Sequence, residues 1–255
     1  MATPTADAFR ALHTGRAADD PLVLPGPWDA ASARAFADAG FPALATPSAG
    51  VAASLGYADG SVPAEEMFAA VARIVRAVDI PVSVDVEGGY GLPPAELAER
   101  VLGTGAVGCN LEDGDAASGT PGDPRRHADR LAALRAAAGG ALFVNARVDT
   151  YLHGTGDLAD ALARIALYTD AGADGVYPIR APAGHLPRLC AGTELPVNVL
   201  AEAEGADPAA LGRLGARRIT FGGGLQERVQ GMVAGLAREL APGAGHREAP
   251  GAPRG

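Results

Sequence analysis

The sequence predicts a single α/β domain in which eight strands and eight helices alternate and close into a (β/α)8 barrel of the TIM type. Short apolar, β-branched runs alternate with amphipathic segments along the whole chain, which is typical of a parallel sheet with helical crossovers. Four amphipathic segments end in a glycine that allows a left-handed cap before the next strand; these are Gly40, Gly105, Gly172 and Gly215. Eight such units favour a closed barrel over the alternative, a doubly wound open sheet.

The predicted elements follow from hydrophobic periodicity. The strands are expected at 22–24, 43–46, 82–86, 107–111, 142–146, 175–178, 197–200 and 219–221. The helices are expected at 30–39, 64–78, 94–103, 124–138, 158–171, 184–191, 208–215 and 225–240. Together they predict one domain over residues 1–240, followed by a disordered tail at 241–255 that is rich in Pro, Gly and Ala.

Composition excludes several classes of function. The 255 residues carry a formal net charge of −9 and 48% hydrophobic residues, which argues against a nucleic-acid partner and for a large core. No stretch approaches the roughly 18 apolar residues that span a membrane, and the first ten residues do not resemble a signal peptide. Cys109 and Cys190 lack the spacing of a zinc site or a redox pair. We therefore expect a cytoplasmic protein with reduced thiols.

Charged side chains follow three predicted strands where each strand ends. Asp85 and Glu87 follow the third strand, Glu112 the fourth and Arg147 the fifth. Since the carboxyl ends of parallel strands share one rim, these groups should converge. Oxygen ligands suit Mg2+, or Mn2+ in its place, and Mg2+ commonly keeps several waters. We predict Asp85 as a direct ligand, with Glu87 and Glu112 direct or water-mediated; the alternative is that the acids cap helices or face solvent.

Arg147 indicates a small anionic substrate beside this cation. Its planar guanidinium can pair bidentately with a carboxylate or phosphonate, or it can neutralise the rim acids as a structural salt bridge, and both roles are compatible. Asp113 and Asp149 directly follow the key rim residues and are predicted to be structural. The candidates for proton transfer are Asp59, Tyr57, Ser118 and a metal-bound water, and Arg147 is a further catalytic candidate.

Further candidates for contact with substrate lie after the first strand, at and after the end of the second, and at the centre or end of the seventh. Asp29 either lines the pocket floor or caps the next helix. The turn at 46–50 either cradles an anionic oxygen with its backbone N–H groups or is an ordinary tight turn. The full set of substrate-binding candidates is Trp28, Asp29, Thr46, Pro47, Ser48, Ala49, Arg147 and Asn198.

The ordered segments 25–34, 48–59, 85–87, 110–113 and 146–148 resemble the isocitrate lyase/phosphoenolpyruvate mutase superfamily. The resemblance implies an α/β barrel, usually oligomeric, whose eighth helix is swapped between subunits, and hence a homodimer or homotetramer. It implies that Asp85 binds Mg2+, that Glu87 and Glu112 support the metal through water, and that Arg147 holds the substrate carboxylate. It further implies an oxyanion-binding turn around 47–49 and an acidic residue, Asp59, near the reacting group.

Departures from that pattern bear on the reaction. The segment 115–123 lacks the Cys, Lys and His of the lyases and the Lys and Asn-Ser of the mutases, and Pro47 stands where many relatives have Ser. We predict a Mg2+-dependent C–C bond lyase, or the reverse condensation, on a small 2-hydroxy or 2-oxo dicarboxylate through a metal-bound enolate. The alternatives are a hydrolase of oxaloacetate or phosphonopyruvate-like acids, a P–C phosphonomutase, and a non-catalytic metabolite-binding barrel.

Overall fold

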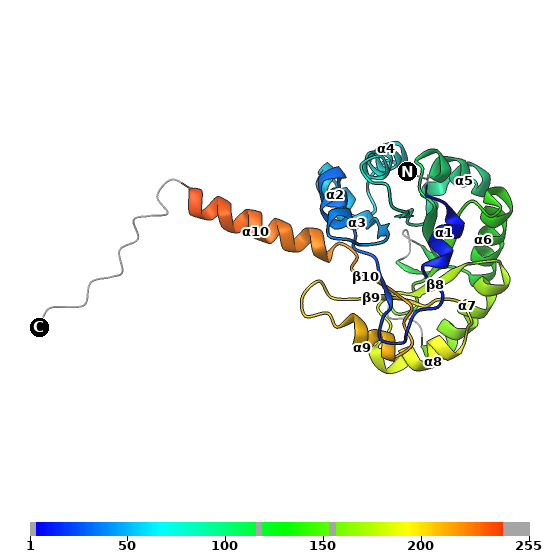
Figure 1. Ribbon diagram of the computed structural model, residues 1–255. Coiled ribbons are helices and arrows are strands. Elements are labelled where there is room, and N and C mark those ends of the chain that lie inside the picture. The colour runs from blue at the N-terminus through cyan, green and yellow to red at the C-terminus, as the bar shows by residue number, and fades with distance from the viewer. Residues whose placement is uncertain (1–3, 116–118, 153–156, 242–255) are drawn as a thin grey trace, which may run out of the picture.

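Eight parallel strands curve around a common centre in the computed structural model, which describes residues 4–115, 119–152 and 157–241 (Figure 1). The strands are short, and their side chains are almost all buried. They are β1 (Leu22–Val23), β2 (Leu44–Ala45), β3 (Val82–Asp85), β4 (Gly108–Glu112), β7 (Phe143–Val148), β8 (Gly175–Pro178), β9 (Asn198–Leu200) and β10 (Arg218–Thr220).

The strands close into a ring. One ladder runs β2-β3-β4-β7-β8 and the other runs β1-β10-β9. A bridge between Val176 and Val197 joins β8 to β9, and the Ala45 N–H donates to the Pro25 carbonyl at 3.2 Å, which joins β2 to the end of β1. The predicted α/β barrel is therefore confirmed, and the open sheet is excluded.

Helices cover the outside of the barrel (Figure 1). Most of them match the predicted amphipathic segments, with ends that differ by a few residues. They are α1 (Ala6–Ala11), α2 (Ala30–Asp38), α3 (Ser48–Leu55), α4 (Ala64–Val75), α5 (Pro94–Gly103), α6 (Pro124–Ala138), α7 (Leu158–Asp170), α8 (Leu186–Ala191), α9 (Pro208–Arg213) and α10 (Gly224–Leu240), with short 3-10 turns η1 (Gly89–Gly91) and η2 (Ala183–His185).

Two helices and a hairpin were not expected from the sequence. Helix α3 begins where the sequence predicted only a turn, and α1 precedes the first strand. The hairpin pairs β5 (Gly114–Asp115) with β6 (Thr120–Pro121) in antiparallel fashion. The predicted tail lies outside the described residues except for Ala241.

Helix α1 closes the amino-terminal end of the barrel. Phe9 is fully buried and meets Phe143, the first residue of β7, edge to face with ring centroids 5.2 Å apart. The His13 ring stacks on the same Phe143 ring at 4.4 Å. Burial of these rings removes apolar surface from water. The opposite end of the barrel, where the strands finish, is therefore the end available for a site.

Helix α10 differs from the others because it extends away from the barrel (Figure 1). Several of its apolar side chains are exposed, including Met232 at 65% and Leu236 at 57%. The exchange of this helix between subunits stays a prediction. Among the described residues, no helix combines the length and apolar character needed to cross a membrane.

Candidate active site

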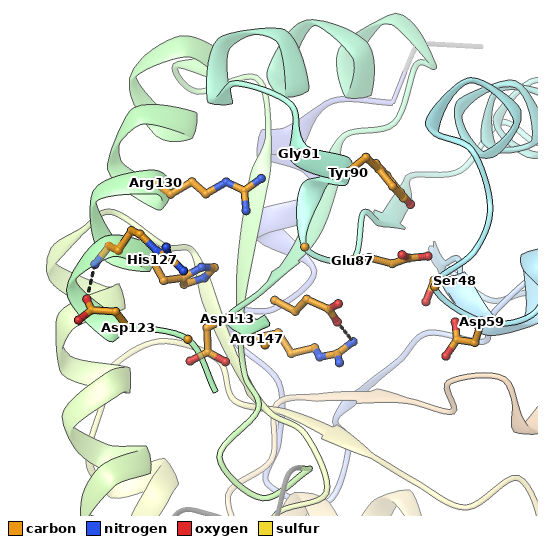
Figure 2. A pocket seen from close by; sticks show the side chains of 16 residues that line it. Ser48, Asp59, Glu87, Tyr90, Gly91, Asp113, Asp123, His127, Arg130 and Arg147 are labelled. Carbon is orange, nitrogen blue, oxygen red and sulfur yellow. Dashed lines mark hydrogen bonds and ion pairs between the residues drawn. The ribbon is translucent and has the colours of Figure 1, made fainter. Parts of the chain in front are cut away.

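The carboxyl ends of β3, β4 and β7 bring the predicted rim residues together, and Figure 2 shows two of them, Glu87 and Arg147. Asp85 ends β3 and lies in register with Asn110. Glu112 ends β4 and lies in register with Arg147 on β7. The Glu112 N–H donates to the Glu87 carbonyl at 3.0 Å, which keeps the turn after β3 beside β4. Adjacent parallel strands thus place three carboxylates and one guanidinium at one rim.

Arg147 is bound by carboxylates on both sides. Its Nη1 lies 2.5 Å from Glu112 Oε2 and 4.0 Å from Asp85 Oδ2. Its Nε donates to Asp149 Oδ1 at 2.6 Å and its Nη2 to Asp149 Oδ2 at 3.1 Å. The Nε–Nη2 edge of the guanidinium, which could pair bidentately with a substrate carboxylate, is therefore already bound by Asp149. Only Nη1, shared with Glu112, faces the other rim acids.

A buried network behind the rim fixes the ends of β4 and β7. The Asp113 carboxylate accepts hydrogen bonds from the Asp149 N–H at 2.8 Å, from Arg164 Nη1 at 2.8 Å and from the Tyr168 hydroxyl at 2.5 Å. Hydrogen bonds to a buried charged group are among the stronger ones in proteins. Asp113 and Asp149 are structural, as the sequence predicted, because one anchors the backbone and the other orients Arg147.

Asp85 is held from three directions. Its Oδ2 accepts a hydrogen bond from Ser48 Oγ at 3.1 Å, and its Oδ1 accepts one from the Glu87 N–H at 3.2 Å. Its own N–H donates to Thr46 Oγ1 at 3.3 Å. Thr46 and Ser48 follow β2, whereas Glu87 lies in the turn after β3 itself. Because Ser48 and Glu87 each bond a different carboxylate oxygen, the Asp85 carboxylate has a defined orientation at the barrel mouth.

The surroundings of Glu87 and Glu112 disfavour the ionised form of their carboxyl groups. Burial, with Asp85 and Asp59 nearby, raises the pKa of Glu87 to about 7. Burial also raises the pKa of Glu112 to about 8, although the Arg147 guanidinium opposes the shift. Glu87 Oε1 is buried and has no hydrogen-bond partner among the described residues. A cation with its waters would supply both the missing charge and the missing donor.

The residues present fit a hydrated divalent cation better than a fully protein-ligated one. Within residues 4–115, 119–152 and 157–241, no three His, Cys, Asp or Glu side chains converge closely enough to ligate one metal ion. Mg2+ often takes only one or two protein carboxylates and keeps its remaining waters. The geometry therefore favours Asp85 as the protein ligand, with Glu87 and Glu112 acting through water, over three direct carboxylates.

Two cavities open at this rim, of about 750 and 270 Å3. Ser48, Asp59 and Arg147 line both. The smaller cavity also contains Asp85, together with the predicted anion-binding turn of Thr46, Pro47, Ser48 and Ala49. Pro47 is the N-cap of α3, so the first N–H groups of that helix lack helical partners. The predicted anion-binding turn is therefore the N-terminus of α3.

Trp28 and Asp29 do not reach the site. Asp29 caps α2: its Oδ1 accepts the Ser32 N–H at 2.7 Å, and Ser32 Oγ bonds back to the Asp29 N–H at 3.1 Å. This reciprocal pair is a capping box. Trp28 packs edge to face on Phe36, with ring centroids 6.4 Å apart. Neither residue lines either of the two cavities at the rim, so their assignment to substrate binding is corrected, and Asp29 caps α2.

Tyr57 and Asn198 are also corrected. The Tyr57 hydroxyl donates to Glu66 Oε1 at 2.7 Å at the protein surface. Asn198 is fully buried inside the barrel, and its Nδ2 donates to Thr220 Oγ1 at 3.0 Å. Neither lines either of these two cavities. The sequence assigned Tyr57 from the segment after the second strand and Asn198 from the centre or end of the seventh, whereas Tyr57 follows α3 and Asn198 begins β9. Ser118, another candidate for proton transfer, lies outside the described residues.

Backbone strain marks one predicted residue, Glu87, and two residues that sequence reasoning missed, Tyr90 and Arg180. The non-glycine residues with positive φ are Glu87 at 49°, Tyr90 at 55° and Arg180 at 59° among the described residues, and all three line a cavity. Such conformations concentrate at functional sites. The Tyr90 hydroxyl is buried and has no hydrogen-bond partner within the described part of the chain. Burial and Glu87 raise its pKa, so it stays protonated. The sequence feature that could have pointed to Tyr90 is its position among three glycines, Gly88, Gly89 and Gly91.

A family model described as phosphoenolpyruvate phosphomutase matches residues 9–241. The chain belongs to this family. The resemblance seen in the sequence is therefore confirmed, and membership is consistent with a rim that carries acids and an arginine. The match covers every strand of the barrel and the whole of α10.

Proteins similar to this chain carry different names. An uncharacterised protein of Mycobacterium tuberculosis is 37% identical over 204 residues, which are 79% of this chain and 78% of that protein. The 2-methylisocitrate lyase of Bacillus subtilis is 31% identical over 183 residues, 68% of this chain and 59% of the lyase. A Burkholderia cenocepacia crystal structure, provisionally named a phosphonomutase, is 41% identical with a TM-score of 0.85, covering 92% and 99% of the two chains.

Proposed function

We propose that this member of the phosphoenolpyruvate phosphomutase family is a Mg2+-dependent lyase, with Mn2+ able to replace Mg2+. It would cleave, or form, a C–C bond next to a carboxylate in a small 2-hydroxy or 2-oxo dicarboxylate. The convergence of Asp85, Glu87, Glu112 and Arg147, with Glu87 Oε1 left unpaired, supports this proposal most strongly. The Bacillus subtilis relative named as a lyase supports the reaction class.

Each rim residue has a distinct task in this reaction. Asp85 would hold the metal directly, while Glu87 and Glu112 would hold its waters. When bound, Mg2+ would supply Lewis-acid stabilisation of the negative charge that develops on a substrate oxygen. Arg147 would offer Nη1 to the substrate carboxylate in competition with Glu112, because Asp149 occupies its other edge.

Cleavage also needs a base for the hydroxyl proton and an acid for the carbon that is released. Asp59 lines both cavities, and burial and Asp85 raise the pKa of its carboxyl group, which favours proton exchange. Tyr90 offers a protonated hydroxyl from the segment that follows Glu87. We assign the proton transfers to Asp59 and Tyr90, in place of the loop thiol of the lyases.

A direct assay tests the proposal. The protein is incubated with Mg2+ and a panel of 2-hydroxy dicarboxylates, and release of a 2-oxo acid is followed. We expect turnover of at least one compound, its loss in EDTA, and its loss in Asp85→Asn. The matched control Asp79→Asn changes an exposed carboxylate away from both cavities and should keep full activity. Turnover that persists in Asp85→Asn would contradict the proposed role of the rim.

Hydrolysis of oxaloacetate or phosphonopyruvate-like acids is the second candidate. Asp59, in both cavities, could orient a water, and the segment 115–123 contains no Cys, Lys or His to act as the lyase acid. The same assay distinguishes this reaction by release of oxalate plus acetate, or of phosphate. A P–C phosphonomutase would instead isomerise its substrate. Binding without turnover would favour a metabolite-binding barrel.

We also propose that the protein is a homodimer or homotetramer built through α10. This helix extends from the barrel (Figure 1), and five of its exposed side chains are large and apolar: Val229, Met232, Val233, Leu236 and Leu240. Contiguous exposed apolar surface on a soluble protein commonly marks an interface. Exchange of α10 between subunits would bury it.

A further inference from the structure

The larger cavity has a basic end that the proposed reaction does not use. Arg126, His127 and Arg130 lie in the first two turns of α6, and all three line the cavity that contains Glu87 and Glu112. Arg126 and Arg130 are four residues apart and therefore lie on one face of the helix. Figure 2 shows Arg130 reaching from α6 toward the Gly91 segment, on the other side of the cavity from Asp59.

These two arginines lack a counter-charge. In the described residues, no carboxylate lies within ion-pair distance of either guanidinium, whereas Arg147 and Arg164 each bind two or more acids. Asp123 lines the same cavity, but its Oδ1 accepts the backbone N–H of Arg126 at 2.8 Å as the cap of α6. Like charges four residues apart on a helix destabilise it. An arginine pair that lines a cavity and has no carboxylate partner is suited to bind an external anion.

The surroundings strengthen this interpretation. Arg130 is partly buried against the 88–91 segment, where a Cβ on Gly89 would collide with its guanidinium. Burial and the nearby Arg126 lower the pKa of Arg130, which an anion would reverse. His127 is buried, and its pKa is lowered to about 4, so it adds no charge at neutral pH.

The size of the cavity also supports binding of an anion at the arginine pair. Its volume of about 750 Å3 lies in the range that holds ligands much larger than a four-carbon acid. One end carries Glu87, Glu112 and Arg147, and the other carries the arginine pair. A substrate that engages the rim at one end has room to extend toward α6.

We propose that Arg126 and Arg130 form an outer anion subsite that binds a second anionic group of the substrate, a carboxylate or a phosphate. This inference rests on the proposed function for the end of the substrate at the rim. It makes the preferred substrate a longer acid with a distal anionic group. The two arginines thus determine specificity, and the rim residues perform the chemistry.

Binding measurements on the full chain test the subsite without requiring turnover. With Mg2+ present, the probes for calorimetry are oxalate, 2-oxoglutarate and 3-phosphohydroxypyruvate. We expect Arg126→Gln and Arg130→Gln each to weaken at least one of the two longer probes roughly tenfold, the loss typical of one charge-assisted hydrogen bond, and to leave oxalate within about twofold. The longer probe that loses more identifies the distal group as carboxylate or phosphate. The matched control Arg125→Gln alters an exposed arginine outside the cavity and should leave all three probes unchanged.

A second measurement separates failure of the subsite from failure of the proposed function. Inorganic phosphate is titrated into the protein in EDTA, where binding at the arginine pair needs no metal. We expect phosphate binding that weakens in Arg126→Gln, an exposed position whose substitution does not threaten folding, even if every turnover assay is negative. Equal affinities of wild type and both variants for all four probes, or absence of phosphate binding together with absence of binding by the longer probes, would overturn the subsite. Failure of oxalate to bind with Mg2+ would count against the proposed function instead.

Discussion

Tyr90 carries a buried hydroxyl with no hydrogen-bond partner among the described residues, beside Glu87. Removing an unsatisfied buried hydroxyl should leave the free energy of unfolding unchanged or raise it by up to about 1 kcal/mol. If Tyr90 transfers a proton, kcat of Tyr90→Phe should fall by roughly 10^2–10^4-fold. Chemical denaturation and steady-state kinetics measure the two quantities. Tyr57→Phe is the matched control, because its hydroxyl bonds Glu66 outside both cavities; equal kcat values in the two variants would exclude Tyr90.

His13 should make stability depend on pH. Its Nδ1 donates to the Phe9 carbonyl at 2.9 Å, and burial together with Arg218 lowers its pKa to about 3. The unfolded chain binds this proton below about pH 6.5 and the folded protein does not, so stability is lost as the pH falls from about 6.5 toward 3. The slope for one such group approaches about 1.4 kcal/mol per pH unit.

Urea denaturation of wild type and His13→Gln at pH 7, 6, 5 and 4 isolates this contribution. The comparison is needed because the raised pKa values of Glu87 and Glu112 act in the opposite sense, adding stability as the pH falls below about 8. His13→Gln should lose less stability than wild type on acidification. If the free energies of unfolding of the two proteins changed with pH in parallel, His13 would bind its proton as readily in the folded state as in the unfolded chain, which would contradict the lowered pKa.

At the scale of elements, the network behind the rim couples α7 to the strands that carry the site. Tyr168 and Arg164 on α7 both bind Asp113, which in turn holds the Asp149 N–H. Tyr168→Phe removes a donor from a buried carboxylate and should lower the free energy of unfolding by about 1–3 kcal/mol. It should also lower activity, since Asp149 orients Arg147. Denaturation measures this quantity. A loss of free energy of unfolding below about 0.5 kcal/mol would mean that the network does not stabilise the fold.

Sequence patterns predicted elements better than they predicted side-chain directions. Periodicity and helix-ending glycines located the eight strands and the helices between them, because burial on a barrel imposes those patterns. Helix α3 was missed since Pro47 and its small neighbours resemble a turn, and capping of α2 by Asp29 could not be told from a role in the pocket. Register along β3, β4 and β7 explains why Asp85, Glu112 and Arg147 were correctly placed together. Tyr57 and Asn198 were misplaced because the sequence revealed neither the helix before Tyr57 nor the start of β9 at Asn198.

At the scale of the whole molecule, the exposed apolar face of α10 should determine assembly. We expect light scattering to give a mass of two or four chains for the wild type. Leu236→Glu places a charge where the side chain is 57% exposed in one chain, and it should shift the mass toward one chain. Gln230→Glu adds the same charge at a polar, exposed position of the helix and should retain the assembly. A wild type that stays monomeric at all concentrations would contradict the proposed interface.

Binding of a divalent cation at the barrel mouth is the claim on which the proposed function depends. Titration of the metal-free protein with Mn2+, followed by electron paramagnetic resonance, measures it directly. We predict one tightly bound ion per chain that Mg2+ displaces, loss of that ion in Asp85→Asn, and retention in Asp79→Asn. Equal Mn2+ binding by wild type and Asp85→Asn, or no binding by the wild type, would contradict the account.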